Sequence, residues 1–492
     1  MKKKFNMLRF SRYFTVLLAF LIIAYSCAKD KDKDPDPVEI QNRKINDWIL
    51  ETMEACYYWN EQIPGKTDKK LSPEKYFESL IYEGDEFSII YENFAALMAL
   101  LSGVNIEAGY DFNLFRVSET DIMGYITYIK PGTPAEKAGL QRGDYFMTIN
   151  NEEMNVDNIN RLYQEMSKSH TLGIADFEES VVYNVALNVI VYEENPILLD
   201  TVYQDINGKK IGYFVYNFFA RDSKDNGIGY EKELNELFGK FSDEGIDELI
   251  IDLRYNSGGT IITAMALASM ISGRSSDDIL GYEEYNSLLS AYFERRDGSD
   301  YNKMYFLDYI VRTQGNRTVE TVPVNKLSGL NRVYMIVSQG SASASELLIN
   351  CLRPYMPVFL VGETTRGKNV GSSLFYDEDD PDNDWGMLPI ILKLSNRDGF
   401  SDYANGFTPD SEDLHELVIT EGRKQSEYEL DMDMKPLGDT NERLLAATLD
   451  MIFGKQPLKR QNIIAKPEII GSSIDRFPAR KNMYITPSHK LK

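Results

Sequence analysis

The amino-acid sequence predicts an α/β fold, a sheet packed against helices, for residues 196–454. Short apolar runs that read as strands alternate there with longer amphipathic runs that read as helices. The expected strands are KIGYFVYNFF, DELIIDLRYN, RVYMIVS and PVFLVGE, and the expected helices include ELNELFGKFSDEG, ITAMALASMISG, SELLINCLRPY and NERLLAATLDMIFG. Such alternation is typical of a sheet with helices on its faces. Residues 279–327, rich in tyrosine, asparagine and charge, interrupt the pattern and are expected to form an insertion.

Length and charge limit the classes of protein to consider. A chain of 492 residues is too long for one typical domain. Its net charge is −23, and the first 26 residues contain five basic and no acidic residues, so the rest is more acidic still. Phosphate backbones would repel so acidic a body, which argues against nucleic acid as a partner.

The N-terminus predicts export. MKKKFNMLRFSR is basic, and the apolar run YFTVLLAFLIIA that follows is too short to span a bilayer, as in a secretory signal over residues 1–26. Ala24 and Ser26 before Cys27 resemble a bacterial lipobox, in which the cysteine is lipidated; ordinary cleavage nearby is the alternative. Residues 27–40 predict a charged tether like that of Bacteroidota lipoproteins, hence an outer-membrane lipoprotein on the surface or periplasmic face.

Residues 41–98 predict an N-terminal helical segment, because aromatic and apolar residues recur at three- and four-residue spacing. Trp48, Tyr57 and Trp59 could line a ligand site, but packing against a neighbouring domain is the favoured interpretation.

The mature chain would keep two cysteines besides Cys27. Cys56 and Cys351 both lie in apolar, helical-looking runs. Two cysteines make no disulfide scaffold, so buried free thiols are predicted.

Residues 99–195 contain a run of strands and turns, ITYIKPGTPAEKAGLQRGDYFMTINNEEM. A strand, a Pro-Gly turn, a short helix and a Gly-Asp turn into a second strand resemble a PDZ domain. Such domains bind an extended peptide as an added strand, with loop amides around its terminal carboxylate. By this resemblance the candidate carboxylate loop is Gly109, Tyr110, Asp111 and Phe112, with Asp111 where the family has a glycine.

A run of small residues, GSASASELLIN, follows the expected strand VYMIV. Ser343 and Glu346 fit a capping box, in which the serine side chain accepts from the first helical turn. On this stretch alone a plain helix cap is the favoured interpretation of Ser343, and a nucleophile is the alternative.

The next expected strand shifts this balance, because PVFLVGETTRGKNVG ends in a glycine-flanked loop that carries Lys368. Ser343 and Lys368 would then leave neighbouring strands at one edge of the sheet, where α/β folds place ligands. A lysine acts as a base only when neutral, which requires lowering its ordinary pKa of ~10.4 by roughly three units through burial. A serine beside a buried lysine needs no histidine.

A third strand end, IIDLRYNSGGT, contains paired glycines before a helix. The backbone amides of Gly258 and Gly259 would be exposed there and could hold an oxyanion. For Asp252 and Arg254, a structural ion pair is favoured over a catalytic role.

The combined order of these features resembles the tail-specific, or C-terminal processing, serine peptidases. The shared features are the helical segment, the PDZ run, Asp-Leu-Arg-x-Asn-x-Gly-Gly, Ser-Ala-Ser-Glu, and a Gly-Lys whose lysine lies 25 residues after the serine. The resemblance covers residues 41–454. It implies a crotonase-like or Clp-protease-like α/β core that cleaves exported polypeptides near their C-termini after the PDZ domain binds the tail.

The same resemblance implies roles for individual residues. Ser343 would be the nucleophile and Lys368 the general base, while the N–H groups of Ala344 and of Gly258 or Gly259 would form the oxyanion hole. No metal or cofactor is implied. The family commonly has a glutamine four residues after the lysine, which orients the lysine amine. Here that position is Ser372, so Ser372 or Ser373 would have to take the role of the glutamine.

Two other functions remain open at this point. One is a peptide-binding surface lipoprotein with a weak or inactive peptidase fold, and the other is acyl-CoA chemistry, as in crotonase relatives. Residues 455–492, basic and proline-bearing, are expected to form an extended appendage rather than a domain.

Overall fold

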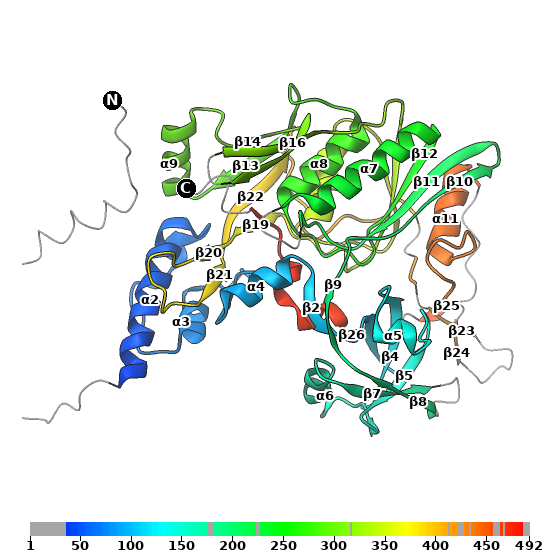
Figure 1. Cartoon of the computed structure of the whole chain (residues 1–492), viewed down its shortest axis with the longest axis horizontal. Helices are drawn as coiled ribbons and strands as arrows, with labels where there is room; N and C mark the ends of the chain where they lie inside the picture. Colours follow the sequence, from blue (N-terminus) through cyan, green and yellow to red (C-terminus); the bar gives the residue numbers. More distant parts are fainter. Residues whose placement is uncertain are drawn as a thin grey trace, which may run out of the picture.

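The structure is a computed structural model with an α/β core, a PDZ domain beneath it and a helical segment beside both (Figure 1). It describes residues 36–175, 181–222, 227–314, 317–411, 414–416, 418–421, 428–431, 434–455, 463–465 and 468–485. The predicted signal peptide and Cys27 lie outside the described residues. Within those residues, every helix is too short or too polar to cross a bilayer.

The core sheet has five strands in the order β10-β11-β12-β17-β18, of which β11, β12, β17 and β18 run parallel. Its strands are β10 (Ile197–Ile206), β11 (Lys209–Tyr216), β12 (Glu248–Asp252), β17 (Val333–Val337) and β18 (Val358–Gly362). Three helices contribute to the core on one face: α7 (Gly229–Glu244), α8 (Ile261–Ser272) and α10 (Ala344–Leu352). The fourth, α11 (Arg443–Ile452), packs on the other face. Because both faces are buried, the parallel strands are mostly apolar, which confirms the predicted α/β core, whereas the edge strand β10 is only partly buried.

A second sheet has the order β14-β13-β22-β19-β27. Its strands are β14 (Lys303–Tyr305), β13 (Ile279–Tyr285), β22 (Ile390–Asn396), β19 (Val370–Ser373) and β27 (Tyr484–Ile485). The predicted insertion therefore contributes two strands to this sheet, since β13 pairs with β22. The rest of that region forms α9 (Ser287–Asp297) and the hairpin of β15 (Tyr309–Gln314) and β16 (Arg317–Pro323).

The N-terminal segment is helical, as predicted. It comprises α2 (Pro37–Cys56), η2 (Asn60–Gln62), α3 (Pro73–Leu80), β1 (Ile89–Tyr91) and α4 (Phe94–Leu101). Tyr57 is buried, and Trp48 and Trp59 are half-buried, in one cluster with Met387 and Ile390 of the core. The aromatic residues thus pack between domains. β1 extends this contact by pairing with β21 (Gly386–Leu388), which also pairs with β20 (Phe375–Tyr376).

Cys56 and Cys351 are free and buried, as predicted. Burial raises the pKa of the Cys56 thiol to about 12, and that of Cys351 also rises for the same reason. Thiols held in this protonated form are poor nucleophiles.

The PDZ domain is built on a sheet ordered β26-β3-β4-β5-β7-β8. Its elements are β2 (Val104–Glu107), β3 (Tyr110–Arg116), β4 (Ile122–Ile129), α5 (Pro134–Lys137), β5 (Tyr145–Ile149), β6 (Glu152–Glu153), α6 (Ile159–Glu165), β7 (His170–Ala175), β8 (Val181–Leu187) and β9 (Ile190–Glu193). The edge strand β26 (Ile469–Ser472) is not local: it comes from the C-terminal part of the chain and pairs antiparallel with β3.

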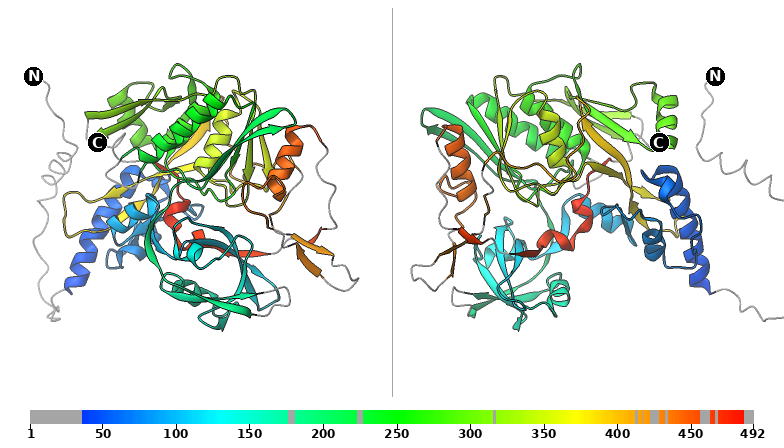
Figure 2. Two further views of the ribbon diagram at one scale, coloured as in Figure 1. Left: turned by 45° about the vertical axis from the view of Figure 1, so that its right-hand side comes forward. Right: turned by 180° about the vertical axis from the view of Figure 1, so that it is seen from behind.

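Residues 468–485, here called the return segment, run from the PDZ domain back to the core (Figure 2). After β26 the segment forms η3 (Ser473–Arg476) and η4 (Pro478–Lys481), and β27 then pairs parallel with β19. The predicted extended appendage is therefore corrected for these residues. The physical reason is burial: Ala479 and Met483 are fully buried, and Ile485 joins the main core cluster. Strands β23 (Val418–Glu421), β24 (Tyr428–Asp431) and β25 (Ile463–Ala465) form a small separate sheet.

Candidate active site

Ser343 lies at the turn between β17 and α10 in a backbone conformation that side chains rarely adopt, with φ 64° and ψ −113°. The residue is fully buried, and its hydroxyl has no hydrogen-bond partner among the described residues. A hydroxyl that served as a helix cap would accept from the first turn. Strain and an unused buried hydroxyl are instead typical of a functional residue. Ser343 and Glu346 also meet as the predicted capping box, so the strain and the unused hydroxyl support a nucleophile at a residue that also begins the helix.

Glu346 connects the serine turn to the lysine loop. One carboxylate oxygen accepts from the backbone N–H groups of Ser343 at 2.9 Å and Lys368 at 2.7 Å. The other accepts from the Gly367 N–H at 2.7 Å and the Thr365 hydroxyl at 2.6 Å. Burial raises the pKa of Glu346, and these four hydrogen bonds oppose the rise. One side chain thus fixes both predicted site residues in register, a role that the capping-box pattern indicated only in part.

Lys368 follows β18 and is 1% exposed. Its amine donates to Asn482 Oδ1 at 2.5 Å and to the Lys481 carbonyl at 3.2 Å, and lies 4.3 Å from the ring centre of Phe87. Burial lowers the pKa of the lysine to about 7, although the charges of Asp85 and Glu346 act in the opposite direction. About half of the Lys368 amine is therefore unprotonated near pH 7, and a general base has to be unprotonated to accept a proton.

Gly258 lies directly against Ser343. A Cβ added to Gly258 would lie 2.6 Å from the Ser343 Cβ and 3.1 Å from its hydroxyl oxygen, and the glycine has φ 115°. The Gly258 N–H donates to Asn256 Oδ1 at 2.9 Å, and the Gly259 carbonyl accepts from the Tyr484 N–H at 3.1 Å. Ala344 is the first residue of α10, a position whose N–H has no partner within the helix. Gly258 and Ala344 thus lie beside the serine, with the Gly258 N–H bonded to Asn256, whereas an added Cβ on Gly259 would meet the Phe219 backbone.

Replacing Gly258 with alanine is expected to lower kcat/KM by at least about 10²-fold, the scale of losing an oxyanion donor. The added methyl would displace Ser343. Gly208→Ala is the matched control, because Gly208 also has positive φ (78°) but has no atom within 4 Å of an added Cβ. It should cost about 1 kcal/mol of stability and leave kcat/KM unchanged. Equal activity loss in both variants would contradict the placement of Gly258.

Ser372 and Ser373 are buried in β19, and neither hydroxyl has a hydrogen-bond partner among the described residues. The prediction that one of them holds the lysine amine is therefore corrected. The amine instead binds Asn482, which the return segment brings alongside β19, where the Ser372 N–H donates to the Met483 carbonyl at 2.8 Å.

Asp252 and Arg254 form the predicted structural ion pair, with 2.7 Å between Arg254 Nη2 and Asp252 Oδ2. Both are almost fully buried, and Arg254 also binds Glu442 at 2.8 Å and Glu416 at 3.0 Å. Burial opposes ionisation of Glu442, but the charge and hydrogen bonds of Arg254 outweigh it and lower the pKa to about 2. This network fixes the strand end that precedes Gly258.

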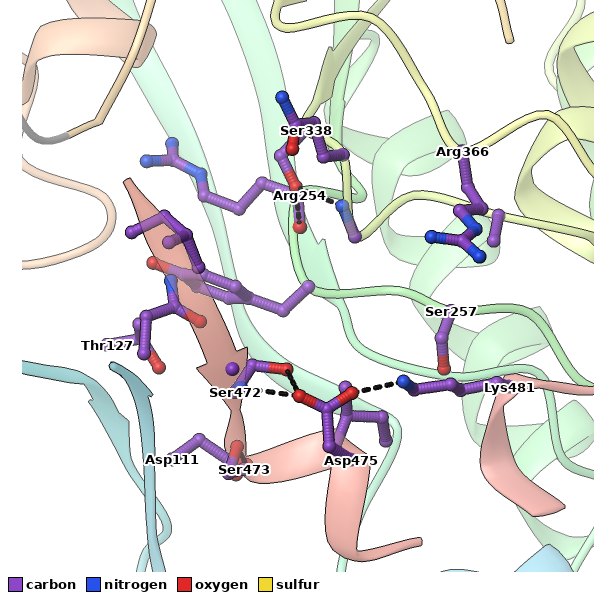
Figure 3. A pocket seen from close by; sticks show the side chains of 18 of the residues that line it. Asp111, Thr127, Arg254, Ser257, Ser338, Arg366, Ser472, Ser473, Asp475 and Lys481 are labelled. Atoms are coloured by element: carbon purple, nitrogen blue, oxygen red, sulfur yellow. Dashed lines mark hydrogen bonds and ion pairs between the residues drawn. The ribbon is translucent and has the colours of Figure 1, made fainter. Parts of the chain in front are cut away.

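A cavity of about 560 Å³ extends from the PDZ strand β3 to Lys368. Figure 3 looks into it, with Ser472, Ser473 and Asp475 of the return segment near Lys481 and Ser257. Ala342, Lys368 and Asn482 also line the cavity, whereas the buried Ser343 is not part of its wall. The cavity provides a continuous route between the PDZ domain and the lysine.

The predicted carboxylate loop lies at the PDZ end of this cavity. Asp111 is buried, its carboxylate pairs with Lys130 at 3.0 Å, and it accepts a hydrogen bond from the Ser473 hydroxyl. Tyr110 begins β3 and bonds His170 at 2.7 Å, while Phe112 is buried in the PDZ core. Gly109 has φ 91° and no room for a side chain against Thr133. Peptide binding by this loop stays a prediction, because β26 occupies the adjacent edge.

Comparison with known proteins agrees with this arrangement. Residues 210–412 match the model of peptidase family S41, residues 44–89 the S41 N-terminal domain, and residues 125–172 a PDZ domain. A crystal structure described as an S41 protease of Bacteroides fragilis is 25% identical, with a TM-score of 0.63. That likeness covers 87% of this chain and 99% of the other.

Two relatives are named as carboxyl-terminal processing proteases. The protein CtpA of Bacillus subtilis is 24% identical over 56% of this chain and 50% of its own length. The protein of Picosynechococcus is 26% identical over 58% of this chain and 59% of its own length. The chain thus spans about half to three fifths of these relatives. With the matched N-terminal, PDZ and peptidase domains in the predicted order, the chain belongs to peptidase family S41.

Proposed function

We propose that the protein is a serine endopeptidase in which Ser343 is the nucleophile and Lys368 the general base. The observation that carries this proposal is the buried lysine, whose pKa lies at about 7 and whose loop is tied through Glu346 to the serine turn. The substrates would be exported polypeptides cut near their C-termini, the activity for which the two relatives are named.

The chemistry follows from these groups. Neutral Lys368 takes the proton of the Ser343 hydroxyl as its oxygen attacks the scissile carbonyl carbon. The Ala344 N–H stabilises the oxyanion together with the Gly259 N–H, or with the Gly258 N–H once it exchanges its bond to Asn256 for the oxyanion. The C–N bond then breaks as Lys368 returns the proton to the leaving nitrogen, and water hydrolyses the acyl-serine ester.

The experiment is cleavage of unfolded casein by the mature protein beside Ser343→Ala, with new amino termini quantified by mass spectrometry. The parent should cleave, and the variant should lose at least about 10⁴-fold in rate. A silent parent would favour the second candidate, a peptide-binding protein with an inactive peptidase fold. The complete burial of Ser343 and the occupied PDZ edge support that candidate.

A peptide that pairs with β3 has to displace β26. Tyr163 donates to the Ser472 carbonyl and Ser473 donates to Asp111, so both hydroxyls hold the return segment in place. Removing both, in Tyr163→Phe with Ser473→Ala, should raise the affinity for an added apolar C-terminal peptide about 5- to 30-fold, at about 1 kcal/mol for each bond. Fluorescence anisotropy measures this, with the exposed Ser118→Ala as control; an unchanged Kd would contradict the competition.

We propose further that Cys27 carries a lipid that anchors the protein at the outer membrane. The lipobox-like residues before it support this. Radiolabelled palmitate should enter the parent but not Cys27→Ser, which should leave the membrane fraction; a labelled variant would refute the anchor site.

A further inference from the structure

Among the described residues, Asn482 makes the shortest hydrogen bond to the Lys368 amine. Its Oδ1 lies 2.5 Å from Lys368 Nζ, and the residue is 2% exposed. The neighbouring Lys481 carbonyl accepts from the same amine at 3.2 Å. Two consecutive residues of the return segment thus accept the hydrogen bonds that the Lys368 amine donates to described residues.

Two hydrogen-bond acceptors are the right number for a lysine amine that acts as a base. A neutral primary amine has two N–H bonds and one lone pair. If the two N–H bonds point to Asn482 Oδ1 and the Lys481 carbonyl, the lone pair is left for the proton of the serine hydroxyl. Both acceptors are neutral, so neither holds the amine in its charged form as a carboxylate would.

The return segment is built into the core rather than laid over it. Met483, next to Asn482, is fully buried in the main core cluster, and β27 pairs with β19. The Tyr484 N–H donates to the Gly259 carbonyl at 3.1 Å, and the Ser257 hydroxyl donates to the Arg480 carbonyl at 2.8 Å. Arg480 is itself buried and pairs with Glu194 at 3.0 Å. Displacing the segment would uncover apolar surface and separate a buried charge from its partner, which is costly.

We propose that Asn482 is a positioning residue that orients the Lys368 amine toward Ser343. This inference rests on the proposed peptidase function. Two observations favour it over a plug that must leave before substrate enters: the anchoring of the segment, and the cavity of about 560 Å³ that stays open beside Asn482. The charged groups that act on the amine are Asp85, Glu346 and Arg366, and none of them belongs to the return segment.

The test uses three variants of the full mature protein. Asn482→Ala should lower kcat about 10- to 100-fold on casein-derived peptides with KM within twofold, as when an orienting partner is removed. Asn482→Gln keeps the amide and should restore part of the loss. Asn482→Asp places a carboxylate on the amine, so the pH midpoint of kcat/KM should rise by about one to three units.

A second readout does not depend on turnover. Acetylation of Lys368 by acetic anhydride, followed by peptide mass spectrometry across pH, reports the protonation of the amine directly. Its midpoint should lie near 7 in the parent and rise in Asn482→Asp. Asn207→Asp is the control, since Asn207 lies in the exposed turn between β10 and β11, at the sheet edge opposite the site. It adds the same charge and should shift neither midpoint.

The outcomes separate the two proposals. Asn482→Ala with parental or higher kcat would overturn the positioning role and identify the segment as a plug. An unchanged acetylation midpoint in Asn482→Asp would also overturn it. A parent that cleaves nothing, but whose acetylation midpoint rises in Asn482→Asp, would support the contact with Lys368 and refute the peptidase function.

Discussion

Lys368→Ala is expected to lower kcat/KM by about 10⁴-fold or more, as for loss of the base in other serine peptidases. Glu346 holds the backbone of the lysine loop against the serine turn, and the Lys368 amine, whose pKa burial lowers to about 7, is the proposed base of that loop. Lys368→Arg should be equally inactive, because a guanidinium stays protonated and offers no lone pair.

The pH dependence of the parent follows from the same group. Because burial lowers the pKa of Lys368 to about 7, the amine is an ammonium below that pH and cannot accept a proton. We expect kcat/KM to rise tenfold per pH unit below 7 and to level off above it. Initial rates on a fluorogenic peptide between pH 5 and 9 measure this. A profile that is flat through pH 7, or appreciable activity in Lys368→Arg, would contradict lysine as the base.

Arg254→Leu is expected to lower the free energy of unfolding by about 3–5 kcal/mol, the cost of breaking a buried ion pair from one side. Arg254 is 1% exposed and binds both Asp252 and Glu442. Without it those two carboxylates would remain buried with one partner fewer. Glu442, whose pKa is lowered to about 2 against the effect of burial, would lose its main source of stabilisation.

Urea unfolding followed by circular dichroism measures this loss. Arg161→Leu is the control, because Arg161 and Glu152 form an ion pair whose side chains are 58% and 47% exposed. Such surface pairs contribute at most about 1 kcal/mol. If both variants lost the same small amount, the Arg254 network would not be the stabilising element inferred here.

Features that depend on local chain geometry were predictable from the sequence. The strands of the core, the turns at Ser343 and Lys368, and the Asp252–Arg254 pair all lie within short runs whose patterns fix their conformation. Parallel strands also end at one edge, so the sequence indicated that serine and lysine share a side of the sheet.

The contacts that complete the site were not predictable, because they join distant parts of the chain. Asn482 is 114 residues from Lys368 in sequence, and Phe87 comes from the N-terminal segment. The sequence contained one indication of such a contact. Ser372 stands where the family has a glutamine, so another residue has to bind the lysine amine. The pairing of β26 with β3 likewise left no local pattern, since any short apolar run can add to a sheet edge.

The return segment also determines when the site can form. Ribosomes deliver Ser343 and Lys368 well before Asn482, and the chain crosses a membrane in the same order if it is exported. Until residues 468–485 emerge, the lysine has neither of its two acceptors, and the β3 edge is unpaired. A growing chain therefore carries an incomplete site until the return segment has been made. The site can therefore take its described geometry only after the return segment has been synthesised.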